Sequence, residues 1–406
     1  MKWAEAAASV SLCVLLVGCP GGGDDGSPAP SGPANVLAVS VGTSNVCNNV
    51  NELCAAVTIC QPGTSTCQTV SDLLVDVGSV GLRVFGSLLT IPLQQEVDVQ
   101  GNPLGTCAHF ADGGATWGPV QVADVVLGGE PAVRVPIQVI NPTFAGKTVT
   151  NNPCNATVDS NPSDASFNGI LGIGLFMQDC GSACVGNNNS NNNLYFSCVA
   201  STCTSTAVPL SGQLQNPVGL LPVDNNGVVL ALPSVPANGA ASVSGSLILG
   251  IGTAGNNMPP AGIPVLTTDD NSGVLNTVYK GQNLQAIIDS GSNGLFFPDA
   301  AFPPNPVCAA PLDPFYCPAN TLNTMATITG INGTPKPVQF QVANTANLVQ
   351  TNNAAFNNLG GTAGGQFSMF FDWGLPFFFG RTVFVGIEGQ PSPLRVGIGP
   401  NPYFAF

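Results

Sequence analysis

Two short segments of this chain repeat one pattern of residues, 213 positions apart. Residues 73–86 read LLVDVGSVGLRVFG and residues 286–299 read AIIDSGSNGLFFPD. Five of the fourteen positions are identical and pair Asp76 with Asp289, Gly78 with Gly291, Ser79 with Ser292, Gly81 with Gly294 and Leu82 with Leu295. Each copy is typical of a strand that ends in a tight loop and returns as a buried strand. The repeat therefore predicts a two-lobed protein in which the two loops meet.

A carboxylate between apolar strands is costly to enclose unless it is paired or protonated, so Asp76 and Asp289 are the candidate catalytic residues. Two carboxyl groups about 3 Å apart cannot both ionise, and they share one proton. One can then take a proton from a bridging water that attacks an amide carbonyl, while the other donates to the oxyanion and the departing amine. This chemistry needs no histidine, metal or cofactor, and it suits mildly acidic pH.

The residues that follow each aspartate suit such a pair. Gly78 and Gly291 allow the two backbones to approach closely. A hydroxyl on Ser79 or Ser292 can bind the outer carboxylate oxygen and fix its orientation.

Composition favours an all-β fold and excludes some partners. The 406 residues suffice for two lobes that each bury a core. Many glycines (49) and prolines (35) separate short apolar runs, and we find no long segment with a helical period. A net charge of −14 argues against nucleic acid and anionic membrane surfaces as partners.

The paired D-[T/S]-G-[S/T] loops resemble those of the pepsin-like aspartic peptidases. VLAVSVGTS (36–44), TWGPVQVADVVLGG (116–129) and FNGILGIG (167–174) resemble other segments of that family in the same order, and GSLILGIG (245–252) and the aromatic run from 371 match more loosely. The resemblance covers about residues 36–406 and is closest to bacterial exported proteins of unassigned function with these signatures. It implies an N-terminal lobe over 36–232, a C-terminal lobe over 233–406 and a cleft between them.

The same resemblance assigns roles to residues outside the aspartates. A flap is expected near residues 110–118, where Phe110, Ala111 or Trp117 stands in place of the family's tyrosine. The residue after each aspartate normally carries a hydroxyl that bonds the opposite loop. Ser290 fits this role, but Val77 cannot donate, so we expect looser carboxylate positions and weakened catalysis.

The N-terminal segment predicts export. Residues 1–18 contain an apolar stretch too short to span a membrane and suited to a signal peptide. The sequence Leu16-Val17-Gly18-Cys19 resembles a bacterial lipobox, which implies that Cys19 is acylated and anchored in the outer membrane. Residues 19–35 then form a flexible tether. An ordinary cleaved signal peptide is the alternative.

Twelve cysteines remain after Cys13 and Cys19, an even number that predicts up to six disulfides in an exported chain. Cys60 and Cys67 flank a predicted turn, and the near-constant sum of positions in an antiparallel ladder predicts Cys184–Cys198 nested inside Cys180–Cys203. Local loops then give Cys47–Cys54 and Cys308–Cys317, and Cys107–Cys154 remains. No paired C-x-x-C motifs suggest a zinc site.

Three other features have weaker interpretations. His109 is the only histidine, and no G-x-S-x-G motif accompanies it for a Ser/His/Asp hydrolase. DNNG (224–227) and Asp269-Asp270 offer oxygens to Ca²⁺ but lack EF-hand spacing, so we interpret them as loops. The aromatic run around residues 369–387 is interrupted by charges and proline and is expected to be core, with Asp372 unexplained.

The sequence thus predicts a membrane-anchored, monomeric aspartic endopeptidase that binds extended peptides or unfolded protein as added strands. A catalytically inactive peptide- or glycan-binding lipoprotein on the same fold is the alternative, because a fold does not determine a function. A structural envelope component is a third class, but it does not explain two matched carboxylate loops.

Overall fold

The computed structural model describes residues 33–111, 113–186, 191–298, 307–362 and 368–406. The predicted signal peptide, Cys13, Cys19 and most of the predicted tether lie outside these residues. Within the described part of the chain, no helix is long and apolar enough to cross a membrane.

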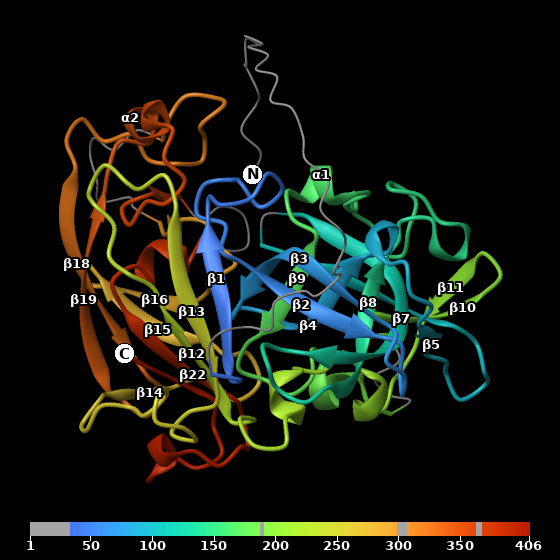
Figure 1. Ribbon diagram of the computed structural model, residues 1–406. Coiled ribbons are helices and arrows are strands. Elements are labelled where there is room, and N and C mark those ends of the chain that lie inside the picture. Colours follow the sequence, from blue (N-terminus) through green and yellow to red (C-terminus); the bar gives the residue numbers. More distant parts are fainter. Residues whose placement is uncertain (1–32, 112, 187–190, 299–306, 363–367) are drawn as a thin grey trace, which may run out of the picture.

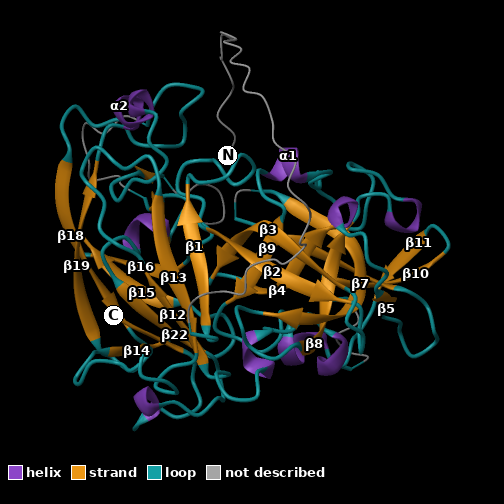
Figure 2. Cartoon of the chain, viewed as in Figure 1, coloured by secondary structure: helices purple, strands orange, loops and turns teal. Residues whose placement is uncertain are grey.

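The fold is all-β, as the sequence predicts (Figures 1 and 2). The first half contains β1 (Val36–Val41), β2 (Cys54–Cys60), β3 (Cys67–Asp76), β4 (Val80–Phe85), β5 (Gln94–Gln95), β6 (Leu104–His109), β7 (Ala115–Val126), β8 (Val133–Ile140), α1 (Pro162–Ala165), β9 (Gly169–Ile173), β10 (Tyr195–Val199), β11 (Thr202–Ser205) and β12 (Gly227–Ala231). The second half contains β13 (Val243–Leu249), β14 (Val265–Thr267), β15 (Leu275–Tyr279), β16 (Gln282–Ile288), β17 (Leu295–Phe296), β18 (Leu322–Thr329), β19 (Pro335–Val342), α2 (Thr345–Leu348), β20 (Gly360–Gly361), β21 (Phe370–Trp373), β22 (Thr382–Gly386) and β23 (Tyr403–Ala405).

Strand pairing joins these elements into two sheets, and the larger sheet continues from a barrel into a central region. In the first half β2, β3, β9, β4, β8 and β7 pair in that order, and β7 also pairs with β2, so the strands close into a barrel. The second half forms a seven-stranded sheet in the order β19-β18-β15-β16-β21-β17-β20. Between them run β1, β13, β12 and β22, which Figure 1 shows side by side near the centre of the molecule.

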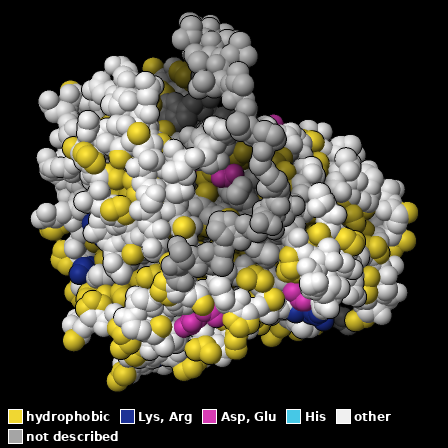
Figure 3. Space-filling model, viewed as in Figure 1, with side chains coloured by type: hydrophobic (Ala, Val, Ile, Leu, Met, Phe, Trp, Pro, Cys, Tyr) yellow, Lys and Arg dark blue, Asp and Glu magenta, His cyan; other side chains and the backbone are white. Residues whose placement is uncertain are grey.

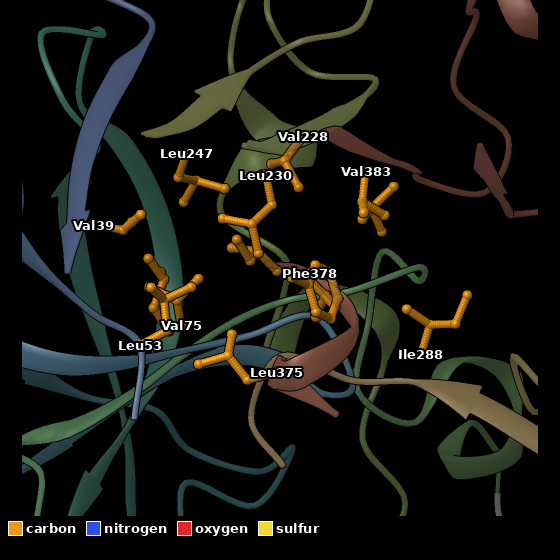
Figure 4. Close-up of a cluster of buried hydrophobic side chains, with 14 of the residues drawn as sticks. Val39, Leu53, Val75, Val228, Leu230, Leu247, Ile288, Leu375, Phe378 and Val383 are labelled. Atoms are coloured by element: carbon orange, nitrogen blue, oxygen red, sulfur yellow. The ribbon is translucent and has the colours of Figure 1, made fainter. Parts of the chain in front are cut away.

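One hydrophobic cluster extends through these parts. Figure 4 shows side chains from both halves packed together, among them Val75, Leu230, Ile288 and Phe378. Val75 and Ile288 directly precede Asp76 and Asp289 in sequence, so the segments that carry the aspartates are anchored in this shared core.

The aromatic run at residues 369–387 belongs to the same core, as predicted. Phe371, Trp373 and Phe378 are buried within the cluster, and a 3-10 helix, Leu375–Phe377, links β21 to β22. On the face drawn in Figure 3, charged side chains are few, in keeping with eight basic and 22 acidic residues in the whole chain.

Candidate functional site

Each repeated segment forms the same strand–loop–strand unit around a third strand. In the first half β3 ends at Asp76 and pairs in parallel with β9, and β4 returns on the other side of β9 in antiparallel pairing. In the second half β16 and β17 flank β21 in the same way. The third strand pairs with both arms of each loop and so holds the two ends of the loop apart. The expectation of a strand, tight loop and returning strand is confirmed in both copies.

The two loops meet, and each places its glycine under the carboxyl group of the other. A Cβ atom added to Gly78 would lie 2.6 Å from Cγ of Asp289, and one added to Gly291 would lie 2.8 Å from Cγ of Asp76. The two carboxyl groups are in hydrogen-bond contact. Because real Cβ atoms do not approach other atoms this closely, hydrogen is the only side chain that these two positions accept at the present separation.

The loop at Asp76 satisfies both oxygens of its carboxyl group. The backbone N–H of Gly78 donates to Oδ1 of Asp76 at 2.7 Å. The hydroxyl of Ser79 donates to Oδ2. These bonds fix the plane of the carboxyl group.

The loop at Asp289 repeats this arrangement. The N–H of Gly291 donates to Oδ1 at 2.8 Å, and the hydroxyl of Ser292 donates to Oδ2 at 2.7 Å. The two loops therefore hold their carboxyl groups with the same pair of donors, a glycine N–H and a serine hydroxyl.

The environment of Asp76 favours its protonated form. Burial is the main cause, and the neighbouring Asp289 adds to it; together they raise the pKa of Asp76 well above its ordinary value. Asp76 is 6% exposed, whereas Asp289 is half-buried.

Ser290 links the two loops as the family resemblance implies. Its hydroxyl donates to the carbonyl oxygen of Val75 at 2.7 Å and accepts from the N–H of Val77 at 3.1 Å. Ser290 is completely buried, so these bonds form without competition from water. Val77 has no hydroxyl with which to return them, and its side chain packs in the central hydrophobic cluster instead.

Two of the residues predicted for a flap, Phe110 and Trp117, lie on the β6–β7 hairpin. Phe110 is half-buried, and its N–H donates to the carbonyl oxygen of Gly114. Trp117 is completely buried between Phe144 and Phe196, and its indole N–H donates to the carbonyl oxygen of Phe144 at 3.3 Å. The indole N–H of Trp117 is therefore already occupied within the protein.

The described residues form six disulfides, and four match the predicted pairs. The nested pairing was wrong: Cys180 bonds Cys184, and Cys198 bonds Cys203. Cys198 and Cys203 face each other across the β10–β11 hairpin, where the antiparallel register places them opposite. Cys180 precedes a 3-10 helix, Gly181–Cys184, whose turn returns the chain to the first cysteine.

The remaining polar candidates lie apart from the aspartate pair. His109 is exposed at the end of β6. Asp269 accepts bonds from the backbone and hydroxyl of Ser272, as expected of a turn. Among the described residues, no group of three or more His, Cys, Asp and Glu side chains is placed to hold a metal ion.

The sequence reasoning missed a buried ion pair behind the first loop. Arg83, on β4, lies 3.4 Å from Asp179, which also accepts from the hydroxyl of Tyr195 at 2.5 Å. Burial raises the pKa of Asp179 to about 6 although Arg83 opposes the shift. One signal was available: an arginine inside the apolar strand VGLRVF requires an acidic or polar partner.

The chain matches a family described as "Protein of unknown function (DUF3443)" over residues 31–406. Because the match covers nearly all of the chain, the protein belongs to this family. A search of curated proteins finds no match.

Proposed function

We propose that this protein is an aspartic-type endopeptidase of pepsin-like descent that hydrolyses peptide bonds at acidic pH. The observation that carries the proposal is the contact between the Asp76 and Asp289 carboxyl groups, presented by two matched loops whose glycines lie under the opposite carboxyl. Two carboxyl groups in contact, with no described cation between them, cannot both ionise, so they share one proton.

The different environments of the two acids assign their roles. Asp289 takes a proton from water while the water oxygen attacks the peptide carbonyl carbon, and Asp76 gives its proton to the carbonyl oxygen. In the second step Asp289 returns its proton to the departing nitrogen, and Asp76 recovers one from a hydroxyl of the tetrahedral intermediate. The products are a carboxylic acid and an amine, and the pair ends with one proton on Asp76.

The substrate we propose is an extended peptide or an unfolded protein, bound by a monomer with no cofactor. We place the protein in the bacterial cell envelope, exported by residues 1–18 and held in the outer membrane through a lipid on Cys19. Labelled fatty acid should appear on the expressed full chain and be absent from Cys19→Ala. Labelling that persists in Cys19→Ala would remove the anchor from the proposal.

The catalytic proposal is tested with Asp76→Asn and Asp289→Asn in the full chain, and Asp270→Asn serves as an exposed control. The unmutated protein and the control should cleave an unfolded protein between about pH 3 and pH 6, and each dyad variant should lose this activity because one carboxyl cannot act as acid and base together. Cleavage by both dyad variants would place the activity elsewhere.

A peptide- or glycan-binding protein without catalysis is the second candidate. It is favoured by Val77, which returns no hydroxyl bond across the loops, and by a cavity of about 850 Å³ in the second half that includes neither aspartate. Amides and aromatic rings line this cavity, among them Asn323, Gln341 and Phe340. Binding of a hydroxyl-containing transition-state-like peptide without any cleavage would favour this role.

A further inference from the structure

A third acid, Asp372, lies on β21, the strand that runs between the two arms of the second loop. It pairs with Ile287 on β16 and with Phe296 on β17. Ile287 lies two residues before Asp289, and Phe296 lies seven residues after it. In the first half the strand residue that pairs with the two corresponding positions, two before and seven after Asp76, is Ile170. The two matched loop units therefore differ here by an acid in place of an apolar residue.

The carboxyl group of Asp372 is enclosed. Its residue is 7% exposed, and Oδ1 has no hydrogen-bond partner. The hydroxyl of Ser292, which donates to Asp289, also lowers the pKa of Asp372, so it lies near this carboxyl. Ser292 thus lies between two acids.

A serine hydroxyl has one proton to donate, and this limits the hydrogen bonds that Asp372, Ser292 and Asp289 can form together. If Ser292 donates to Asp289, Asp372 can bond Ser292 only by donating a proton of its own. If Asp372 were ionised, it would compete for the Ser292 proton and leave Oδ2 of Asp289 without this donor. The arrangement that satisfies both contacts is Asp372–COOH to Ser292 to the Asp289 carboxylate.

The charges around Asp372 favour the same state. Its strand neighbours Ile287 and Phe296 are apolar, and the charged groups that act on it are Asp289 and Asp76. Burial, followed by the charge of Asp289, raises the pKa of Asp372 well above its ordinary value of 3.8. Ser292 opposes the shift only in part.

We propose that Asp372 is a third, protonated carboxyl acid that positions Ser292 and thereby stabilises the Asp289 carboxylate as the base of the dyad. Aligned hydrogen bonds polarise one another, so a donor behind Ser292 strengthens its bond to Asp289. Asp372 is a positioning residue and does not contact the substrate. The proposed benefit to catalysis rests on the proposed peptidase function, whereas the protonation state does not.

The first test needs no enzymatic activity. Infrared difference spectra of the full chain and of Asp372→Asn at neutral pH should reveal the carbonyl stretch of one protonated carboxylic acid that the variant lacks. The same pair should also differ in stability: a pKa raised in the folded state gives Asp372 a stabilising effect below about pH 4 that is lost as pH rises, so Asp372→Asn should gain in relative stability toward neutral pH. A carboxyl at position 372 that titrates near its ordinary value would overturn the proposal.

The second test compares two variants in the cleavage assay. Asp372→Asn keeps a neutral donor to Ser292 and should retain kcat within about threefold, whereas Asp372→Ile, which copies Ile170, should lower kcat about tenfold at unchanged KM, the factor for one lost hydrogen bond. Equal activity of Asp372→Ile and the unmutated protein would refute positioning. Loss in Asp372→Asn as large as in Asp372→Ile would also refute positioning, because it would mean that the carboxyl itself must exchange a proton.

The outcomes separate the two proposals. If the unmutated protein cleaves nothing, the peptidase proposal fails, and the infrared and stability measurements still decide the state of Asp372. If Asp372→Ile does not fold, Asp372→Asn and the spectra remain decisive.

Discussion

Replacement of Ser290 by alanine tests whether one hydroxyl holds the two halves of the site together. The change removes a donor to the carbonyl oxygen of Val75 and an acceptor for the N–H of Val77, at a position with no exposed surface. A buried backbone group left without a partner costs roughly 1–3 kcal/mol, so the two together predict a loss of about 2–6 kcal/mol in the free energy of unfolding. The dyad should also become less ordered, and acid-pH cleavage should fall.

Urea denaturation followed by fluorescence and circular dichroism measures this loss. Ser290→Thr keeps the hydroxyl and should remain close to the unmutated protein. Ser244→Ala, at an exposed position on β13, should change stability by less than about 0.5 kcal/mol. The reasoning is refuted if Ser290→Ala is as stable as Ser244→Ala, because the cross-loop bonds would then contribute nothing.

Three further changes probe other parts of the structure. Val77→Thr supplies the missing hydroxyl in nearly the same volume and should raise acid-pH cleavage or affinity for a hydroxyl-containing inhibitor; equal behaviour with no cleavage by either protein would favour the binding role. Joint replacement of Cys107 and Cys154 by alanine opens the bridge of longest separation, 47 residues, and should cost about 4 kcal/mol in urea unfolding, against about 2 kcal/mol for the bridge that spans five; a smaller loss than for that short bridge would contradict the loop-entropy account. Arg83→Met should destabilise by about 3–5 kcal/mol above neutral pH because it leaves Asp179 buried without its ion-pair partner, and the loss should shrink as pH falls toward about 6, since without Arg83 the pKa of Asp179 lies above that value; a loss independent of pH would show that Asp179 is not the unpaired charge.

The sequence predicted the features that depend on local pattern. The all-β class followed from short apolar runs between turn residues, and the loop units followed from the repeat around Asp76 and Asp289. Four disulfide pairings could be predicted from the sequence because each pair either closes a short loop or is the pair that remains. The hydroxyl of Ser290 was placed correctly because the resemblance supplied a specific geometry.

One disulfide prediction was wrong, and other features stayed open, because they depend on contacts that the sequence does not display. The predicted pairing of Cys180 with Cys203 assumed one long hairpin, whereas the chain forms a 3-10 turn and then a separate short hairpin. Asp372 stayed unexplained because its neighbours on β16 and β17 are remote in sequence. The flap role of Trp117 stays a prediction, and its burial between Phe144 and Phe196 depends on packing that the motif does not show.

The glycines at positions 78 and 291 provide a way to sort the members of this family by sequence alone. A chain with any larger residue at either position cannot keep two carboxyl groups at the separation found here. Such a member would have the fold and both acids yet lack a shared proton, and a search for peptidase activity should leave it aside. Members with glycine at both positions, and an acid at the position of Asp372, are the ones in which to assay hydrolysis first.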